Sequence, residues 1–361
     1  MWDHFGTIYK YTKSTSIYNI FINDCFLLFM MIPKLIFVVV LSSVMNAQIA
    51  LPTFQAVHNS NSSLESLSSD SLTFINCGAS GRSGPTQSQI NSTYTSGHSL
   101  YNSVTINTQG IQEWTVPSSG TYTIEAWGAK GGGDAVGGLG ARMKGEFSLV
   151  QNEVIKIVVG QQGGLAGNDN TSSGGGGTYV IKSPYNSNAS ILVIAGGGGG
   201  SPGSSDYQSG GDDDGQIGTS GSRGYGRTSY SNGGINGNGP SSSSGRASAG
   251  AGFFTNGADN GQSSIYGTGG KAFVNGSEGG QDLYSNSGGG VDGGFGGGGS
   301  GMVSGYRGSG GGGGYSGGGT GTHNSNTNNH QGGGGGSYNN GSNQDNSSGV
   351  GNSHGKVIIT Y

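Results

Sequence analysis

The stretch Leu192-Val-Ile-Ala-Gly-Gly-Gly-Gly-Gly200 joins a short apolar segment of β type directly to a run of five glycines. Similar runs recur along the chain, at Gly174–Gly177, Gly296–Gly299, Gly310–Gly314 and Gly332–Gly336. The chain holds 81 glycines in 361 residues, roughly three times the usual share of about 7%. The fold therefore depends on what glycine runs do between ordinary β segments.

Two structures compete for these runs. Glycine loses the most backbone entropy on ordering and buries no side chain, which favours a disordered linker. Alternatively, consecutive glycines form extended threefold helices of the polyproline-II type that pack backbone to backbone. Aromatic residues, which a flexible linker would lack, punctuate the runs at Tyr179, Tyr266, Phe273, Tyr284, Phe295, Tyr306, Tyr315 and Tyr338. Collagen is excluded, because the chain has 7 prolines and no strict Gly-X-Y period.

The flanking segments have the alternation and β-branched content of strands. They cover residues 111–116, 121–127, 145–149, 154–159, 178–181, 191–195 and 356–361. The last of these follows a long glycine-rich stretch, so the chain returns to the sheet that it left. We therefore predict an all-β fold, an antiparallel β-sandwich that brings the terminal strand beside an early one, with almost no helix.

The N-terminal region has the pattern of an export signal. Lys34 precedes the apolar core Leu35–Leu41, and cleavage is expected near Ala47 or Gln48. We assign residues 1–30 to an upstream extension, 31–48 to a signal peptide and 49–72 to a polar tether. An uncleaved anchor over Phe26–Val44 is the alternative. No second apolar stretch of spanning length follows, so the mature chain is expected to be secreted or on the cell surface, without a membrane helix of its own.

Several functional classes are disfavoured by the composition. The net charge of -4 gives no electrostatic argument for nucleic acid. The acidic run Asp212–Asp214 fits no calcium loop, and His323 and His330 lack further metal ligands nearby. No defensible Ser/His/Asp constellation, nucleotide loop or kinase signature occurs. We therefore expect no catalytic residues, no metal and no cofactor.

Several blocks of this sequence resemble one family. The block Cys77-Gly-Ala-Ser-Gly-Arg-Ser-Gly-Pro-Thr-Gln87 is similar to the opening of the glycine-rich extracellular domain of the anaplastic lymphoma kinase and leukocyte tyrosine kinase receptors. Further blocks follow in the family's order over residues 73–361, including Gln112-Glu-Trp-Thr-Val-Pro117, Val158-Val-Gly-Gln-Gln-Gly163 and Gly310-Gly-Gly-Gly-Gly-Tyr-Ser-Gly-Gly318.

The resemblance implies a fold and a set of structural positions. In that family the domain is a β-sandwich, similar to tumour-necrosis-factor folds, with an inserted bundle of polyglycine-II helices. Here the sandwich strands would lie mainly in 73–195 and 356–361, and the insert in about 128–355. The structural positions that stand in the matching blocks are Cys77, Gly78, Arg82, Trp114, Trp127, Gly160, Gln161, Gln162 and Gly163.

The departures from the family limit what can be carried over. The family pairs the opening cysteine with a second one, whose place here is near Ile90, and no cysteine stands there. Cys77 could therefore be a free thiol or pair between chains. Kinase motifs are absent, so we expect no enzyme. We predict a module that binds an extracellular protein or surface ligand; the alternative is a structural or adhesive protein without a specific ligand.

Overall fold

The computed structural model describes residues 70–133, 136–166, 171–202, 212–226, 229–261, 266–283, 290–303, 307–323 and 330–361. The chain divides into two units, residues 1–68 and Ser69–Tyr361, and all of the described residues belong to the second. The predicted signal peptide, the alternative anchor and nearly all of the tether lie outside the described residues. Among the described residues, no helix combines the length and apolar character needed to span a bilayer.

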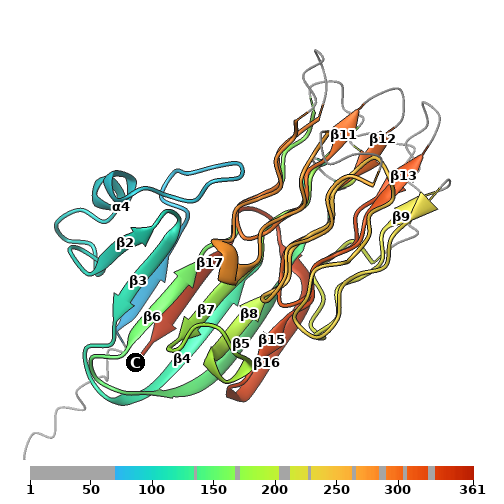
Figure 1. The fold of residues 1–361 in the computed structure, drawn as a ribbon. Coiled ribbons are helices and arrows are strands. Elements are labelled where there is room, and N and C mark those ends of the chain that lie inside the picture. The colour runs from blue at the N-terminus through green and yellow to red at the C-terminus, as the bar shows by residue number, and fades with distance from the viewer. Residues whose placement is uncertain are drawn as a thin grey trace, which may run out of the picture. The chain divides into compact units, whose positions relative to one another are not determined.

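Two antiparallel sheets carry the longer strands, as the alternation pattern predicts (Figure 1). One has five strands, in the order β1 (Ser71–Phe74), β17 (Lys356–Thr360), β4 (Gly120–Trp127), β5 (Gly140–Leu149) and β16 (Ser342–Gly351). The other has six strands, in the order β15 (Tyr338–Asn339), β8 (Ile191–Ala195), β7 (Thr178–Lys182), β6 (Val154–Val158), β3 (Ile111–Thr115) and β2 (Val104–Thr108). The all-β prediction is confirmed, and the terminal strand does pair with the early strands β1 and β4.

One hydrophobic core is shared by the two sheets. Alternate residues of β4 and β5 lie against those of β7 and β8, and side chains of both sheets belong to one buried cluster. Ile124, Met143, Ile157 and Val193 are each at most 1% exposed in it. This packing follows from the period of two in each strand, which turns one set of side chains inward.

Helical structure is confined to short segments. The helix α4 (Gln87–Thr93) begins where Thr86 and Gln89 form a reciprocal capping box. Two 3₁₀ turns, η1 (Asn188–Ser190) and η2 (Phe273–Asn275), complete the helical content among the described residues.

The glycine-rich region contains two small sheets and many extended segments that lie side by side (Figure 1). Its short strands form a four-stranded sheet and a two-stranded one. In order of residue number they are β9 (Tyr225–Gly226), β10 (Ser229–Tyr230), β11 (Met302–Val303), β12 (Arg307–Ser309), β13 (Gly321–His323) and β14 (His330–Gln331).

Between these strands and the two large sheets, the glycine runs bond to one another with a period of three. In the run Gly310–Gly314 and the next residue, amides three apart donate to the same neighbouring segment. The pairs are Gly310 to Ser172 and Gly313 to Gly175; Gly311 to Ser248 and Gly314 to Ala251; Gly312 to Gly333 and Tyr315 to Gly336. Each run is thus ordered by three different neighbours at once, which a free linker would not be.

The period of three recurs in the run Gly196–Gly200. Amides of Gly197 and Gly200 donate to Gly313 and Gly310, and those of Gly198 and Ser201 donate to Ala129 and Gly132. The spacing between runs leaves no room for side chains. A Cβ on Gly312 would overlap the carbonyl oxygen of Gly197, and nearly every glycine of these runs has a carbonyl in the corresponding place.

Aromatic side chains fasten the glycine-rich region to the outer face of the six-stranded sheet. They form a second buried cluster with outward-facing aliphatic residues of β7 and β8 and with Ile111 of β3 and Val158 of β6. Phe253 stacks on Phe273 with ring centroids 5.1 Å apart, and Phe273 stacks on Tyr179 at 5.6 Å. Phe295 and Tyr315 belong to the same cluster. Five of the eight punctuating aromatics therefore lie in it or pack on its edge, namely Tyr179, Phe273, Phe295, Tyr315 and Tyr338; Tyr284 and Tyr306 lie outside the described residues.

Candidate recognition surface

The loop of residues 77–86, which we call the opening loop, contacts both the sheets and the glycine-rich region. Cys77 and Gly78 have positive φ values of 49° and 76°, as the turn-rich sequence suggests. The Arg82 guanidinium lies 3.0 Å from the Glu278 carboxylate and donates to the Gly279 carbonyl at 3.3 Å. The loop therefore holds η2 and its surroundings against the sheet edge.

Cys77 is a buried free thiol, 4% exposed. It shares the main core with Ile90 and Tyr94 of the α4 region, close to the place where the resemblance implies a second cysteine. Burial raises the pKa of the Cys77 thiol, so it stays protonated and unreactive at neutral pH.

The segment Gly160–Gly163 connects β6 to the glycine runs. Gln161 is fully buried; its amide donates to the Phe295 carbonyl at 2.8 Å, and its side-chain Nε2 donates to Ser83 at 3.2 Å. The Gly163 amide donates to Lys130 at 2.9 Å, and the Gln162 amide donates to His354 Nδ1 at 3.1 Å. These four residues act as a structural connector.

The two tryptophans among the predicted structural positions have different environments. Trp114 is 3% exposed and packs edge-on against Phe74 and Tyr122 inside the main core. Trp127 is half-buried on the outer face of the five-stranded sheet, where its Nε1 donates to Glu125 at 2.8 Å. Trp114 is therefore a packing residue, whereas Trp127 is accessible to a partner.

Part of the outer face of the six-stranded sheet remains uncovered. The aromatic cluster covers β7, β8 and the pair Ile111 and Val158 of β3 and β6. Beside it, β2, β3 and β6 carry an open row, Thr105, Glu113 and Lys156, paired in register across the three strands. Lys156 Nζ lies 3.5 Å from Glu113 Oε1. Asn107 Nδ2 donates to the other oxygen of this carboxylate at 2.7 Å.

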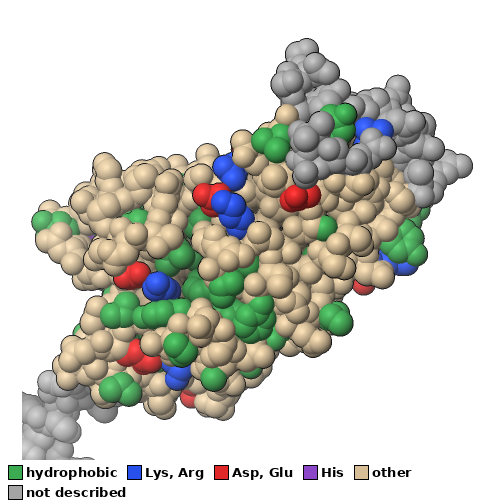
Figure 2. All heavy atoms as spheres, viewed as in Figure 1, with side chains coloured by type: hydrophobic (Ala, Val, Ile, Leu, Met, Phe, Trp, Pro, Cys, Tyr) green, Lys and Arg blue, Asp and Glu red, His purple; other side chains and the backbone are tan. Residues whose placement is uncertain are grey.

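Two hollows meet at the Glu113–Lys156 pair, and we call them together the β3–β6 groove. The first, of about 440 Å³, is polar and is lined by Glu113, Thr115, Thr105 and by residues of the 99–103 loop. The second, of about 270 Å³, is lined by Lys156, Tyr185, Pro184, Ile111 and Val274. Figure 2 shows apolar side chains gathered next to basic and acidic ones on this face.

Tyr185 forms a fixed wall of the groove. Its hydroxyl donates to the Val154 carbonyl at 3.1 Å, and Lys156 Nζ lies 4.5 Å from its ring centroid. Burial, together with the negative charges of Glu113 and Glu153, raises the pKa of the Tyr185 hydroxyl, so it stays a donor at neutral pH. The groove thus combines an apolar end, a charge pair and a hydroxyl-rich end, which suits a peptide rather than a reaction.

Sequence reasoning missed the groove residues. Glu113 and Lys156 are ordinary outward positions of alternating strands, and only the partial cover of the sheet makes them special. The available signal was the single charged residue in each of these two strands. The acidic run takes part in hydrogen bonds with the neighbouring backbone: Asp214 Oδ1 accepts from the Leu139 amide at 2.6 Å, and the Asp213 carbonyl accepts from the Gly199 amide at 2.7 Å. Among the described residues, His, Cys, Asp and Glu nowhere gather in threes as metal ligands would.

Comparison with known proteins gives a partial likeness to a receptor. No protein-family model matches the chain. The leukocyte tyrosine kinase receptor of Mus musculus is 45% identical over 98 residues, which is 25% of this chain and 11% of that receptor. The chain thus spans about a tenth of the length of this relative, and part of it is related to part of a tyrosine kinase receptor.

Proposed function

We propose that residues 71–361 form a non-catalytic extracellular recognition module, resembling part of a receptor ectodomain, which binds a protein ligand in the β3–β6 groove. The partial likeness to the leukocyte tyrosine kinase receptor supports the receptor-like part of this proposal. The groove supports the binding part.

The observation that carries the proposal is the uneven cover of one sheet. Tyr179, Ile181 and Ile194 are fully buried on the outer face by the glycine-rich region. The neighbouring strands keep a hollowed, half-open surface with Val274 41% exposed at its rim. Exposed apolar side chains beside a charge pair and a hydroxyl-rich wall are typical of protein-binding surfaces.

The glycine runs have a mechanical role in this proposal. We infer that they are polyglycine-II helices packed as a bundle inserted into a β-sandwich, because their amides contact the same neighbour every third residue. Such a bundle lacks side-chain freedom and holds η2 rigidly over the sheet. A rigid wall lowers the entropy that ligand binding must overcome.

Photocrosslinking tests the assignment of the surface. A photoreactive residue is placed at Val274 in the groove or, as a matched control, at Ile217, which is 51% exposed in the glycine-rich region. In native extracellular fluid we expect one major adduct at position 274. Unlabelled wild-type protein should compete for it, and the Val274→Glu variant should not.

Two results would contradict this proposal. Equal adducts at both positions would mean that the groove has no special role. Adducts made only with further copies of the chain would favour a structural or adhesive protein.

A further inference from the structure

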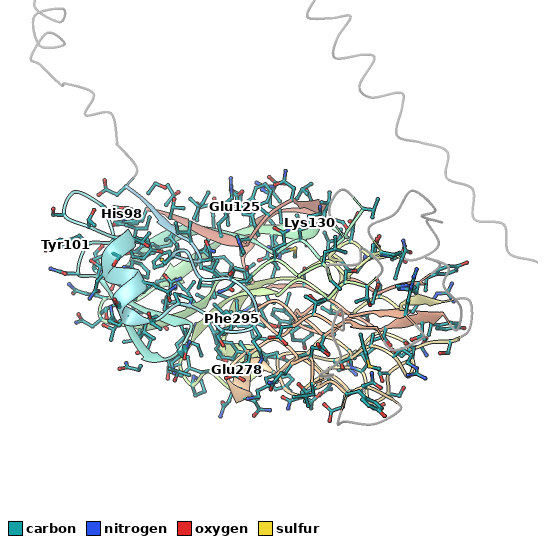
Figure 3. The ribbon with its side chains drawn as sticks, turned by 90° about the horizontal axis from the view of Figure 1, so that it is seen from above. His98, Tyr101, Glu125, Lys130, Glu278 and Phe295 are labelled. Atoms are coloured by element: carbon teal, nitrogen blue, oxygen red, sulfur yellow. The ribbon has the colours of Figure 1, made fainter. Side chains whose placement is uncertain are left out.

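The face opposite the β3–β6 groove carries a further hollow, separate from the two that form the groove. Figure 3 shows Glu125 and Lys130 on this side, away from Phe295 and Glu278. The hollow, of about 320 Å³, is lined by Trp127 of β4, Lys356 of β17 and the turn 352–355, which includes His354. We call it the Trp127 cleft.

Two cations lie over the Trp127 indole, but only one of them is neutralised. The Arg142 guanidinium is 5.7 Å from the ring centroid and contacts Glu125 at 2.7 Å and Asp345 at 3.0 Å. Lys356 Nζ is 4.6 Å from the same centroid. Within the described part of the chain, no carboxylate lies at ion-pair distance from Lys356. The cleft therefore carries one unmatched positive charge.

The imidazole of His354 is held in one tautomer. Its Nδ1 accepts from the Gln162 amide at 3.1 Å, and burial lowers the pKa of the ring, so it is neutral at pH 7. A neutral imidazole that accepts at Nδ1 carries its proton on Nε2. The remaining donor of this cleft residue is therefore fixed as Nε2–H.

The turn that carries His354 is anchored at both sides. The Lys130 amide donates to the Ser353 carbonyl at 2.9 Å, and the Gly355 amide donates to the Gly160 carbonyl at 2.8 Å. The next residue, Lys356, opens β17 and pairs in register with Trp127. The ammonium group and the Nε2–H donor are thus supported by strands and by the glycine connector before any ligand arrives.

We propose that the Trp127 cleft binds a carboxylate, supplied by an acidic side chain of a protein ligand, with Lys356 as its counter-ion and His354 Nε2–H as its hydrogen-bond donor. One unmatched charge and one neutral donor suit a monoanion better than a dianionic phosphate. The indole face and the small volume suit a single side chain. This site is independent of the β3–β6 groove, since it lies on the other sheet.

The test uses two short acetylated and amidated peptides, Gly-Glu-Gly and Gly-Gln-Gly, with the full chain at low ionic strength. Binding is followed by the NMR shifts of the Trp127 indole N–H and the Gln162 amide. We expect the Glu peptide to shift both signals with saturation and the Gln peptide to shift neither. Lys356→Gln should weaken the binding at least tenfold, and Lys356→Arg should retain it.

The control is Lys144→Gln, because Lys144 pairs in register with Glu125 on the same face without lining the cleft. It should leave the affinity for the Glu peptide within twofold. Equal loss in the Lys144 and Lys356 variants would overturn the proposal in favour of diffuse surface charge. Equal shifts by both peptides, or stronger competition by sulfate than by acetate, would overturn the carboxylate assignment.

Discussion

At the scale of single residues, glycine is needed here because it has no side chain. The amide and carbonyl of Gly312 bond to Gly333 and Gly318, and its missing side chain leaves room for the carbonyl of Gly197. Ordinary cores fill such space with methyl groups, whereas this region fills it with backbone. Most glycines in the runs are therefore required by close contact, whereas Gly296 and Gly297 also have positive φ.

Gly312→Ala should be strongly destabilising, because the added methyl group must displace a backbone carbonyl that is itself hydrogen-bonded. Overpacking of this kind costs about 1–3 kcal/mol or more. Gly218→Ala is the matched control, since a Cβ there meets nothing within 4 Å, and we expect it to change the unfolding free energy by less than about 1 kcal/mol. Urea unfolding measures both. Similar losses in the two variants would argue against a close-packed backbone.

His354 should make stability depend on pH. Burial lowers the pKa of His354 in the folded state, so the unfolded chain binds more protons below the ordinary value of about 6.5. Stability contributed by the neutral ring is complete above that pH and declines as the pH falls towards the lower folded pKa. The slope is at most about 1.4 kcal/mol per pH unit for one group.

Urea unfolding between pH 7.5 and 5 measures how the unfolding free energy depends on pH. We expect His354→Gln to make this dependence weaker. The idea fails if the His354 variant keeps the full slope.

At the scale of elements, aromatic side chains from the glycine-rich region are its attachment to the sheet. Phe295 is fully buried, and its amide and carbonyl bond to Gly81 and Gln161. It thus contacts the opening loop and the connector after β6 as well as the second cluster. Its ring also occupies the space beside Gly84 and Gly110.

Phe295→Ala should lower the unfolding free energy by about 3–5 kcal/mol, the usual cost of a large cavity. Val274→Ala, at a 41% exposed position next to Phe273, should cost less than about 1 kcal/mol. Thermal unfolding by circular dichroism compares the two variants. A small effect at Phe295 would show that the glycine-rich region does not depend on this anchor.

The strand β2 forms an edge of its sheet, and Gln87 protects it. The Gln87 side chain accepts from the Ile106 amide at 2.7 Å and donates to the Val104 carbonyl at 3.2 Å, as a further strand would. Unprotected edges recruit other chains. We expect Gln87→Ala to raise self-association in sedimentation velocity runs, while Ser88→Ala on the exposed side of α4 leaves the protein unchanged. An unchanged sedimentation profile for Gln87→Ala would refute this role.

At the scale of the whole molecule, the strands could be predicted from sequence and the pairing of the runs could not. Alternation in residues 111–116 and 121–127 correctly indicated β3 and β4, and the closing segment indicated β17. Every glycine run has the same sequence, so nothing in Gly196–Gly200 specifies Gly310–Gly313 as its partner. The groove escaped prediction for a related reason, because it depends on which strands the glycine-rich region leaves uncovered.

The period of three predicts a specific pattern of amide exchange. Amides of Gly196–Gly200 and Gly310–Gly314 should exchange at least a thousandfold more slowly than free glycine, close to the rates of β4 and β8, because each is hydrogen-bonded inside the bundle. The exposed Gly218 provides an internal contrast. Hydrogen exchange followed by mass spectrometry measures this, and fast exchange across both runs would remove the scaffold from the proposed function.

The place of β17 has a consequence for biosynthesis. This strand, residues 356–360, lies between β1 and β4, although nearly three hundred residues separate it from β1 along the chain. A ribosome must therefore release about 290 further residues after β1 before that sheet can close. Until then, two apolar strand edges stay open and vulnerable to aggregation. Any chain cut before residue 356 should remain dependent on chaperones, whatever the condition of its glycine runs.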